Sequence, residues 1–305
     1  MKHKFLFILL FSLVLEGMVT TQAVAGDYVH QVNTLIGTKG TGLTSGYLYP
    51  GATYPYGMVQ FTPSYFSKRS GFVINQLSGG GCEHMGNFPT FPVKGKLKMS
   101  PDNILNYRIN VSEEKGHAGY YEAMVQEDIK AKLTVTERTG MASYEYPADQ
   151  QYGTIIIGGG ISATPIEQAA IVITAPNKCE GYAEGGNFCG LRTPYKVYFV
   201  AEFDTDAFET GTWKREELMP NTTFAEGEYS GVYFTFDVNK KKNIQYKIGV
   251  SYVSVENARE NLKAENAEWD FQKIQNQAEA KWNHYLGMIE VEAVSYTHLT
   301  LPTNR

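Results

Sequence analysis

The 305-residue sequence is slightly acidic, with a formal net charge of −5 at pH 7, and 19% of its residues are charged. Its Lys and Arg residues are scattered, and their longest run is the triplet at 240–242. Because proteins that bind nucleic acid usually gather basic residues on one face, we expect no nucleic-acid partner. The 21 Tyr and 16 Phe residues suit a sugar-binding surface as well as a β-sandwich core.

Residues 1–25 have the pattern of a secretory signal peptide. A basic start is followed by an unbroken apolar run at 5–15 and by the small-residue cleavage pattern Ala-Val-Ala at 23–25. The apolar run is well short of the roughly 20 residues that span a membrane, and no later segment approaches that length. We therefore predict a periplasmic or secreted protein with no membrane partner.

Residues 26–253 are expected to form one β-rich domain. Short apolar or alternating runs, such as 131–137, 195–203 and 232–238, are separated by Gly, Pro, Asn and Asp and are typical of strands. No repeat of fixed period and no sustained helical pattern occur there. The predicted fold is mainly β, an antiparallel β-sandwich rather than an α/β alternation.

A tempting motif lies inside this β-rich region. Gly158, Gly160 and Ala163 formally match the dinucleotide-binding pattern that follows a strand. That pattern requires a helix whose amino end holds the pyrophosphate, but Pro165 and the β-branched run at 171–174 oppose a helix. We expect a tight turn between two strands instead.

A glycine-rich loop at 77–92 contains the densest group of unusual residues, among them Cys82, Glu83, His84 and Asn87. Glycines let backbone amides approach a ligand closely, and Glu, His and Asn offer the donors and acceptors that sugar hydroxyls require. A Cys-Glu-His metal cluster is a weaker alternative, because sequence neighbours rarely converge on one ion. A plain glycine-bent crossover at the surface also fits.

The sequence contains three cysteines, which leaves one thiol over in an exported protein. Cys179 and Cys189 bracket a Gly-rich segment that we interpret as a loop. In an oxidising compartment these two either close a short disulfide or remain free. If they pair, Cys82 is unpaired, and either buried or placed in a site.

The pattern changes at residues 254–293, which are predicted to be a helical linker. Segments 255–265 and 270–286 are helical in character, and Gly287 is a typical helix end. The second segment places apolar side chains on one face: Phe271, Ile274, Ala278, Trp282 and Tyr285. The helices either lead into a further domain or cap the sandwich.

Residues 294–305 fit nothing before them and resemble the translation of a sequencing adapter. We therefore expect this tail to be an artefact and the sequence to be a fragment of a longer protein, whose natural chain continues past about residue 293.

Several strings, in this order, resemble glycoside hydrolase family 92. They are VNTLIGT at 32–38, PGATYPYGMVQ at 50–60, LSGGGC at 77–82, GYY at 119–121, LTVTERT at 133–139, YFVAEF at 198–203 and KIGVSYVSVENAR at 247–259. The resemblance covers residues 27–292.

The resemblance implies an exported, calcium-dependent, inverting exo-α-mannosidase that acts on N-glycans and other mannose-containing glycans. In that family a β-sandwich of the galactose-mutarotase supersandwich type precedes linker helices and a larger (α/α) barrel. The barrel supplies the general acid, the base and most calcium ligands, so we expect no catalytic residue here and name no metal ligand. The sandwich would form one wall of the pocket and would bind its own carboxyl-terminal catalytic domain as a partner. The substrate-binding residues that the resemblance implies are Tyr56, Gly57, Cys82, Glu83, His84 and Asn87.

Two departures from the family pattern leave the mannosidic linkage open. Residues 73–76 read Val-Ile-Asn-Gln where many members have Ser-His-Thr-His, and the aromatic loop at 64–69 is short. Linkages of the α-1,2, α-1,3, α-1,4 and mannose-phosphate types all remain compatible. Two other functions compete with the pocket-wall domain of an α-mannosidase: a stand-alone carbohydrate-binding sandwich without catalysis, and a secreted structural or adhesive sandwich.

Overall fold

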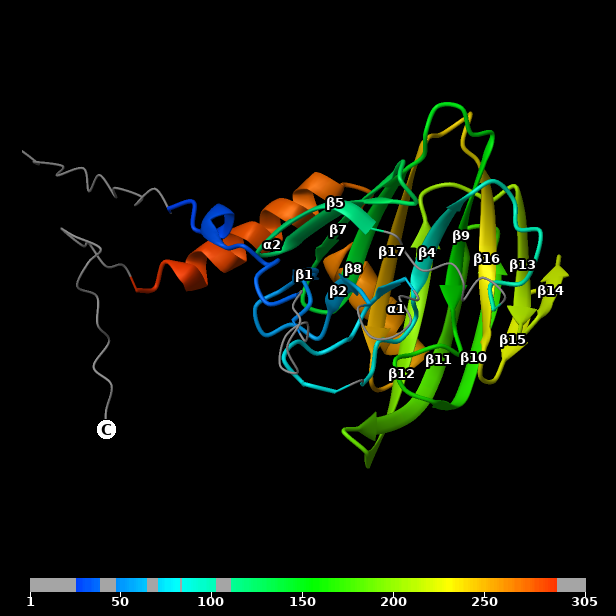
Figure 1. Ribbon diagram of the computed structural model, residues 1–305, viewed down its shortest axis with the longest axis horizontal. Helices are drawn as coiled ribbons and strands as arrows, with labels where there is room; N and C mark the ends of the chain where they lie inside the picture. The colour runs from blue at the N-terminus through cyan, green and yellow to red at the C-terminus, as the bar shows by residue number, and fades with distance from the viewer. Residues whose placement is uncertain (1–25, 39–47, 65–70, 83, 103–110, 290–305) are drawn as a thin grey trace, which may run out of the picture.

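The computed structural model of the chain describes residues 26–38, 48–64, 71–82, 84–102 and 111–289 (Figure 1). The predicted signal peptide, Glu83 and the predicted adapter-like tail lie outside the described residues. Within the described residues the chain folds into two antiparallel sheets followed by two helices. The predicted mainly β sandwich is therefore confirmed.

The first sheet has eight strands among the described residues, in the spatial order β1-β2-β3-β4-β9-β16-β13-β14. Its strands are β1 (Ala52–Thr53), β2 (Gln60–Pro63), β3 (Phe72–Val73), β4 (Thr90–Lys94), β9 (Tyr152–Gly158), β13 (Glu209–Lys214), β14 (Glu217–Pro220) and β16 (Ser230–Asp237).

The second sheet has nine strands in the described part of the chain, in the order β15-β10-β11-β12-β17-β8-β7-β6-β5. Its strands are β5 (Val111–His117), β6 (Tyr120–Val125), β7 (Ile129–Val135), β8 (Thr139–Glu145), β10 (Ile166–Ala175), β11 (Lys178–Phe188), β12 (Leu191–Phe203), β15 (Phe224–Glu226) and β17 (Asn243–Ser251).

Alternating side chains explain how the two sheets meet. In β6 every second residue is buried, as expected when one face of a strand points into a core. Rings from opposite sheets pack against each other between the layers. Phe203 of β12 contacts Phe234 of β16 with ring centroids 4.8 Å apart, and Phe72 of β3 stacks on Tyr144 of β8 at 6.1 Å. The aromatic residues thus fill the sandwich core.

The segment between β9 and β10 carries the rejected dinucleotide motif. It contains no helix, as expected, but it is a crossover of residues 159–165 from the first sheet to the second rather than the expected tight turn. A Cβ at Gly160 would lie 1.9 Å from the carbonyl oxygen of Gly227. The glycine is therefore required by close backbone packing and not by a phosphate group.

The 3-10 helix η1 (Val29–Gln31), α1 (Val255–Glu265) and α2 (Phe271–Leu286) complete the described elements. Both predicted helices are confirmed, and α2 has its cap at Gly287 as expected. The Ser254 hydroxyl accepts from the Asn257 amide and caps α1. None of these helices combines the length and the apolar character needed to cross a membrane.

Helix α1 lies on the outer face of the second sheet, where Ala258 and Leu262 pack on Val200 of β12. A Cβ at Gly249 of β17 would lie 2.5 Å from the Ala258 carbonyl oxygen. The missing side chain at this position lets the helix approach the sheet.

Helix α2 extends past the sandwich beside the amino-terminal segment (Figure 1). The Asn283 side-chain oxygen accepts from the backbone amides of Tyr28 and Val29 at 2.9 and 3.0 Å. The Trp282 indole donates to the Thr53 carbonyl at 2.7 Å. Residues from both ends of the described chain are therefore joined through α2.

A buried lysine joins the second sheet to the connection between the helices. Lys247 of β17 has a side chain only 4% exposed, and it donates to the carbonyls of Asn266 and Ala267 at 2.9 and 3.1 Å. Its ammonium group also lies 4.2 Å from the centre of the Trp269 ring. Burial lowers the pKa of Lys247, and the nearby Glu202 partly opposes this effect.

We expect Lys247→Met to lower the free energy of unfolding by about 2 kcal/mol, because the buried Asn266 carbonyl loses its donor. Lys178→Met is the matched control. Lys178 pairs with the same carboxylate, Glu202, at 3.0 Å, but its side chain is 45% exposed, so its loss should cost about 0.5 kcal/mol or less. Urea unfolding of both variants measures the difference, and equal losses would contradict the anchoring role.

Candidate functional site

The loop at 77–92 connects β3 to β4 and has an unusual backbone. Five of its described residues adopt positive φ angles. Gly79, Gly81 and Gly86 do so without steric cost, whereas a non-glycine residue in this region costs about 1–2 kcal/mol. Strain of this kind often occurs at functional sites and persists only when surrounding contacts hold it. The strained non-glycine residues are Met85 and Phe88.

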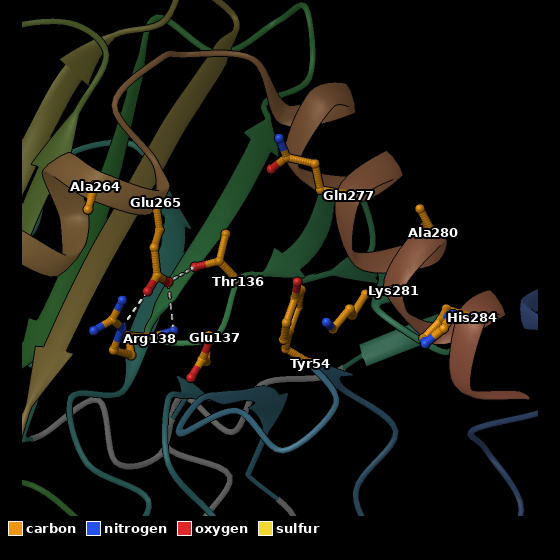
Figure 2. A pocket seen from close by; sticks show the side chains of 10 residues that line it. All are labelled: Tyr54, Thr136, Glu137, Arg138, Ala264, Glu265, Gln277, Ala280, Lys281 and His284. Carbon is orange, nitrogen blue, oxygen red and sulfur yellow. Dashed lines mark hydrogen bonds and ion pairs between the residues drawn. The ribbon is translucent and has the colours of Figure 1, made fainter.

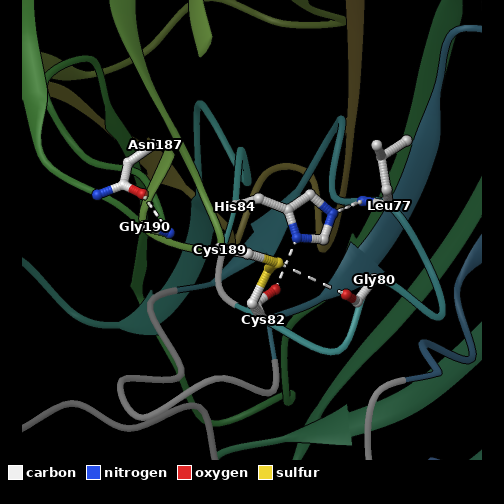
Figure 3. Close-up of a disulfide and its surroundings, with 7 residues drawn as sticks. All are labelled: Leu77, Gly80, Cys82, His84, Asn187, Cys189 and Gly190. Atoms are coloured by element: carbon white, nitrogen blue, oxygen red, sulfur yellow. Dashed lines mark hydrogen bonds between the residues drawn. A yellow bond between two sulfur atoms is a disulfide. The ribbon is translucent and has the colours of Figure 1, made fainter. Parts of the chain in front are cut away.

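One such contact is a disulfide between Cys82 and Cys189, whose Cα atoms lie 5.4 Å apart. Figure 3 shows this bond joining the loop to the turn between β11 and β12. It spans 107 residues of sequence. The loop is therefore fixed covalently to the far sheet, and Cys82 is not a free thiol.

Of the two alternatives left open by the sequence, a disulfide between Cys179 and Cys189 is excluded, because Cys189 is bonded to Cys82. The segment interpreted as a loop is the strand β11, and at about 3.3 Å per residue its ends lie roughly 30 Å apart, far beyond disulfide reach. Cys179 is instead a buried free thiol, and burial raises its pKa. The strand signal was present, since the small residues Cys179, Gly181 and Ala183 alternate with polar ones.

His84 is 2% exposed and lies behind the disulfide (Figure 3). Its Nε2 accepts from the Leu77 amide at 3.0 Å, so Nδ1 carries the proton and donates to the Cys82 carbonyl at 2.7 Å. The Phe188 ring packs edge-on at 5.2 Å. With both ring nitrogens occupied and the Cys82 sulfur in a disulfide, these two residues do not form the alternative Cys-Glu-His metal cluster. The structure assigns His84 to loop support.

Asn87 belongs to a buried amide network. Its side-chain oxygen accepts from Asn75 Nδ2 at 3.0 Å and from the Tyr195 hydroxyl at 2.8 Å. Its backbone amide donates to Asn75 Oδ1 at 2.8 Å. Burial raises the pKa of Tyr195 to about 12, so its hydroxyl remains a donor at neutral pH. The network fixes the loop against β12.

Two neighbouring side-chain amides, those of Gln76 and Asn87, have polar atoms without a hydrogen-bond partner. Both side-chain polar atoms of Gln76 lack a hydrogen-bond partner, and so does Asn87 Nδ2. Each residue is 0% exposed. A Cβ placed on Gly86 would lie 3.7 Å from the Gln76 amide carbon, so Gln76 adjoins the strained part of the loop. A buried unpaired amide typically costs 1–3 kcal/mol, and a native fold that retains one calls for an explanation.

Tyr56 and Gly57, the other two predicted site residues, contact different elements from those that Cys82, His84 and Asn87 contact. Tyr56 is 87% exposed with φ 58°, and its ring lies edge-on to Tyr285 of α2 at 5.3 Å. A Cβ at Gly57 would approach the Glu137 carbonyl oxygen to 3.0 Å. These residues therefore lie against α2 and the β7–β8 turn, whereas Cys82, His84 and Asn87 lie against the β11–β12 side.

A groove beside Tyr56 was not predicted from the sequence. It has a volume of about 680 Å³ and lies between the end of α1, helix α2 and the β7–β8 turn, as Figure 2 shows. Burial, followed by Glu137 and Glu265, raises the pKa of the Tyr54 hydroxyl on its wall. Its lining residues are Tyr54, Thr136, Glu137, Arg138, Ala264, Glu265, Gln277, Ala280, Lys281 and His284.

Glu265, at the end of α1, is a groove carboxylate that accepts several hydrogen bonds. It accepts from the Thr136 hydroxyl at 2.6 Å and from the Arg138 amide at 2.9 Å, and it also pairs with the Arg138 guanidinium (Figure 2). A carboxylate held in this way fixes the helix to the β7–β8 turn. The sequence predicted a strand over 131–137 and a family motif at 133–139, but not the contact of this turn with α1.

No group of three converging carboxylates, as a calcium site would favour, occurs among the described residues. Calcium requires six to eight oxygen ligands. The one group of three converging His, Cys, Asp or Glu side chains in the described part of the chain is His30, His117 and Glu279, and two of these are imidazoles. This group therefore does not have the ligand chemistry of a calcium site.

Peptide mapping under non-reducing conditions should recover Cys82 linked to Cys189, with Cys179 alkylated only after unfolding. Replacing both linked cysteines by Ser should lower the free energy of unfolding by about 3–5 kcal/mol, as for loops of about 100 residues. A Cys179→Ala variant, as control, should retain the linked peptide. A linked peptide containing Cys179 would contradict the assignment.

Two family models match the chain, and both describe domains of the same family. Residues 31–251 match the glycosyl hydrolase family 92 N-terminal domain, and residues 257–301 match the glycosyl hydrolase family 92 catalytic domain. A protein of Arthroderma benhamiae described as an uncharacterized secreted glycosidase is 25% identical over 324 residues, which cover 92% of this chain and 41% of the relative. The chain thus spans about two fifths of that relative's length.

Solved structures share the fold. A family 92 α-mannosidase of Bacteroides thetaiotaomicron superposes with a TM-score of 0.73 at 24% identity, over 86% of this chain and 38% of that chain. It has also been solved in complex with mannoimidazole. An inverting family 92 mannosidase of the same organism gives a TM-score of 0.72 at 25% identity, over 87% and 37% of the two chains. Because the amino-terminal domain match alone covers well over half of the sequence, the chain belongs to glycosyl hydrolase family 92.

Proposed function

We propose that the chain is the amino-terminal part of an exported α-mannosidase that removes mannose from N-glycans and related mannosides. The observation that carries the proposal is the succession of the two family matches, at 31–251 and 257–301, on a fold shared with solved mannosidases. The second match also disfavours a stand-alone carbohydrate-binding sandwich, because α1 and α2 then belong to the beginning of a catalytic domain. The description of the Arthroderma relative as secreted supports export.

In this proposal the loop at 77–92 forms one wall of the substrate pocket. Cys82 and His84 hold the loop by the disulfide and by two hydrogen bonds. Gln76 and Asn87 carry unpaired amide atoms that suit sugar hydroxyls, which donate and accept at once. Most polar atoms of this wall are bonded within the fold, and three amide atoms of Gln76 and Asn87 remain for a sugar to pair with.

The chemistry belongs to groups outside this wall. An inverting glycosidase needs a general acid and a general base, about 6.5–9.5 Å apart, with a water molecule between the base and the sugar. We propose that both carboxyls and the calcium ligands come from the catalytic domain. The exposed ring of Tyr56 would offer an apolar face to the sugar, while the strained loop positions the hydroxyls.

We expect the 305-residue chain to release no mannose from α-mannosides in the presence of calcium. The longer enzyme, in which the catalytic domain follows α2, should release it with inversion. Proton NMR of the first-formed anomer measures both points. Release of mannose by the 305-residue chain would contradict the assignment of the carboxyls.

In the longer enzyme, Gln76→Met should lower kcat/KM without lowering the free energy of unfolding. Removing the two unpaired polar atoms at nearly constant volume should leave the free energy of unfolding unchanged or raise it by about 1 kcal/mol. Loss of one sugar hydrogen bond should lower kcat/KM about tenfold.

Tyr144→Phe is the matched control for Gln76→Met. It removes another buried polar atom that lacks a partner, but from the sandwich core, so it should leave kcat/KM unchanged. An unchanged kcat/KM in Gln76→Met would remove this residue from the pocket wall.

A further inference from the structure

Three metal-binding side chains from distant parts of the sequence converge at the amino-terminal end of the described chain. His30 lies in η1, His117 ends β5, and Glu279 lies on α2. One candidate ligand atom from each lies within 4.8 Å of the other two. The sandwich core and the strained loop at 77–92 do not include these residues, so the cluster needs its own explanation.

The geometry of the two imidazoles favours metal binding. Their ring centroids lie 4.5 Å apart with an interplanar angle of 34°. His117 Nε2 lies 3.0 Å from Glu279 Oε1. Two ligands of one tetrahedral zinc ion, with bonds of about 2.0–2.1 Å, lie roughly 3.3 Å apart, so this pair needs only a small adjustment.

Further groups already orient these ligands. The Asp27 carboxylate accepts from His30 Nδ1 at 2.5 Å, which leaves Nε2 of His30 as the nitrogen available to an ion. The Gln275 amide donates to Glu279 Oε1 at 2.7 Å. Metal-binding histidines typically donate their other ring nitrogen to a carboxylate in this way.

We propose that His30, His117 and Glu279 bind a divalent transition metal ion of the zinc class. Binding replaces the proton between His117 Nε2 and Glu279 Oε1, and this proton passes to solvent. Water completes the coordination. Two imidazoles with one carboxylate are a zinc ligand set, whereas calcium takes only oxygen ligands, so this site is separate from the calcium requirement of the family.

Burial of two of the three ligands adds support. The side chains of His117 and Glu279 are 11% and 16% exposed, so an ion there is partly shielded from water.

The site would fasten the amino-terminal segment to α2. Without metal this attachment includes the two hydrogen bonds that Asn283 accepts from the backbone amides of Tyr28 and Val29. An ion joining residues 30, 117 and 279 would hold these two elements together and would also attach them to β5. Because a bound ligand stabilises the folded state by mass action, its effect should appear as a rise in Tm.

The test uses the chain from Gly26 onward, produced with a histidine-free affinity tag and stripped with EDTA. Titration with zinc should show one saturable equivalent, and cobalt(II) should give the visible absorption of a four-coordinate ion. Zinc should raise the Tm, whereas calcium should not. His30→Ala and His117→Ala should weaken zinc binding at least tenfold and abolish the rise in Tm.

His284→Ala is the matched control, because His284 lies on the same helix outside the cluster, and it should bind zinc as the unmodified chain does. His30 is 56% exposed, so His30→Ala remains informative even if His117→Ala fails to fold. The proposal is overturned if the unmodified chain binds no stoichiometric zinc, or if His30→Ala binds zinc with unchanged affinity. Neither outcome bears on mannosidase activity.

Discussion

The inner faces of the two sheets must be buried against each other, and the remaining features of the domain are arranged around that constraint. Each sheet presents aromatic rings to the other, as Phe203 does to Phe234 and Phe72 to Tyr144. Close packing of this kind resists deformation. The sandwich is therefore a rigid base, on which loops and helices can be held in conformations that they would not adopt alone.

The loop at 77–92 illustrates this dependence. Met85 and Phe88 adopt left-handed backbone conformations, which are unfavourable in isolation. They persist because the Cys82 disulfide ties the loop to the β11–β12 turn and because Asn87 is bonded to Tyr195 of β12. The side-chain amides of Gln76 and Asn87 nevertheless keep atoms without a hydrogen-bond partner. Local stability is thus given up at the loop that we propose as part of the sugar pocket.

Helices α1 and α2 are fastened at several independent points. Lys247 holds their connection, and Glu265 fixes the end of α1 to the β7–β8 turn. Asn283 joins α2 to the amino-terminal segment, beside the His30 cluster. These polar contacts are specific in direction, unlike apolar packing, so they determine where the helices leave the sandwich. A domain that follows α2 would inherit this orientation.

The sequence by itself determined the mainly β fold class, both helices and the family, because apolar periodicity and short motifs are local properties of the chain. It also pointed to the loop around Cys82 and Asn87. Only the tertiary structure decided which cysteines pair, since Cys189 reaches Cys82 through strand pairing across 107 residues. The same holds for the groove at Glu265 and for the cluster of His30 with Glu279, whose members are far apart in sequence. Contacts between distant segments depend on how the sheets stack, and no local pattern encodes that.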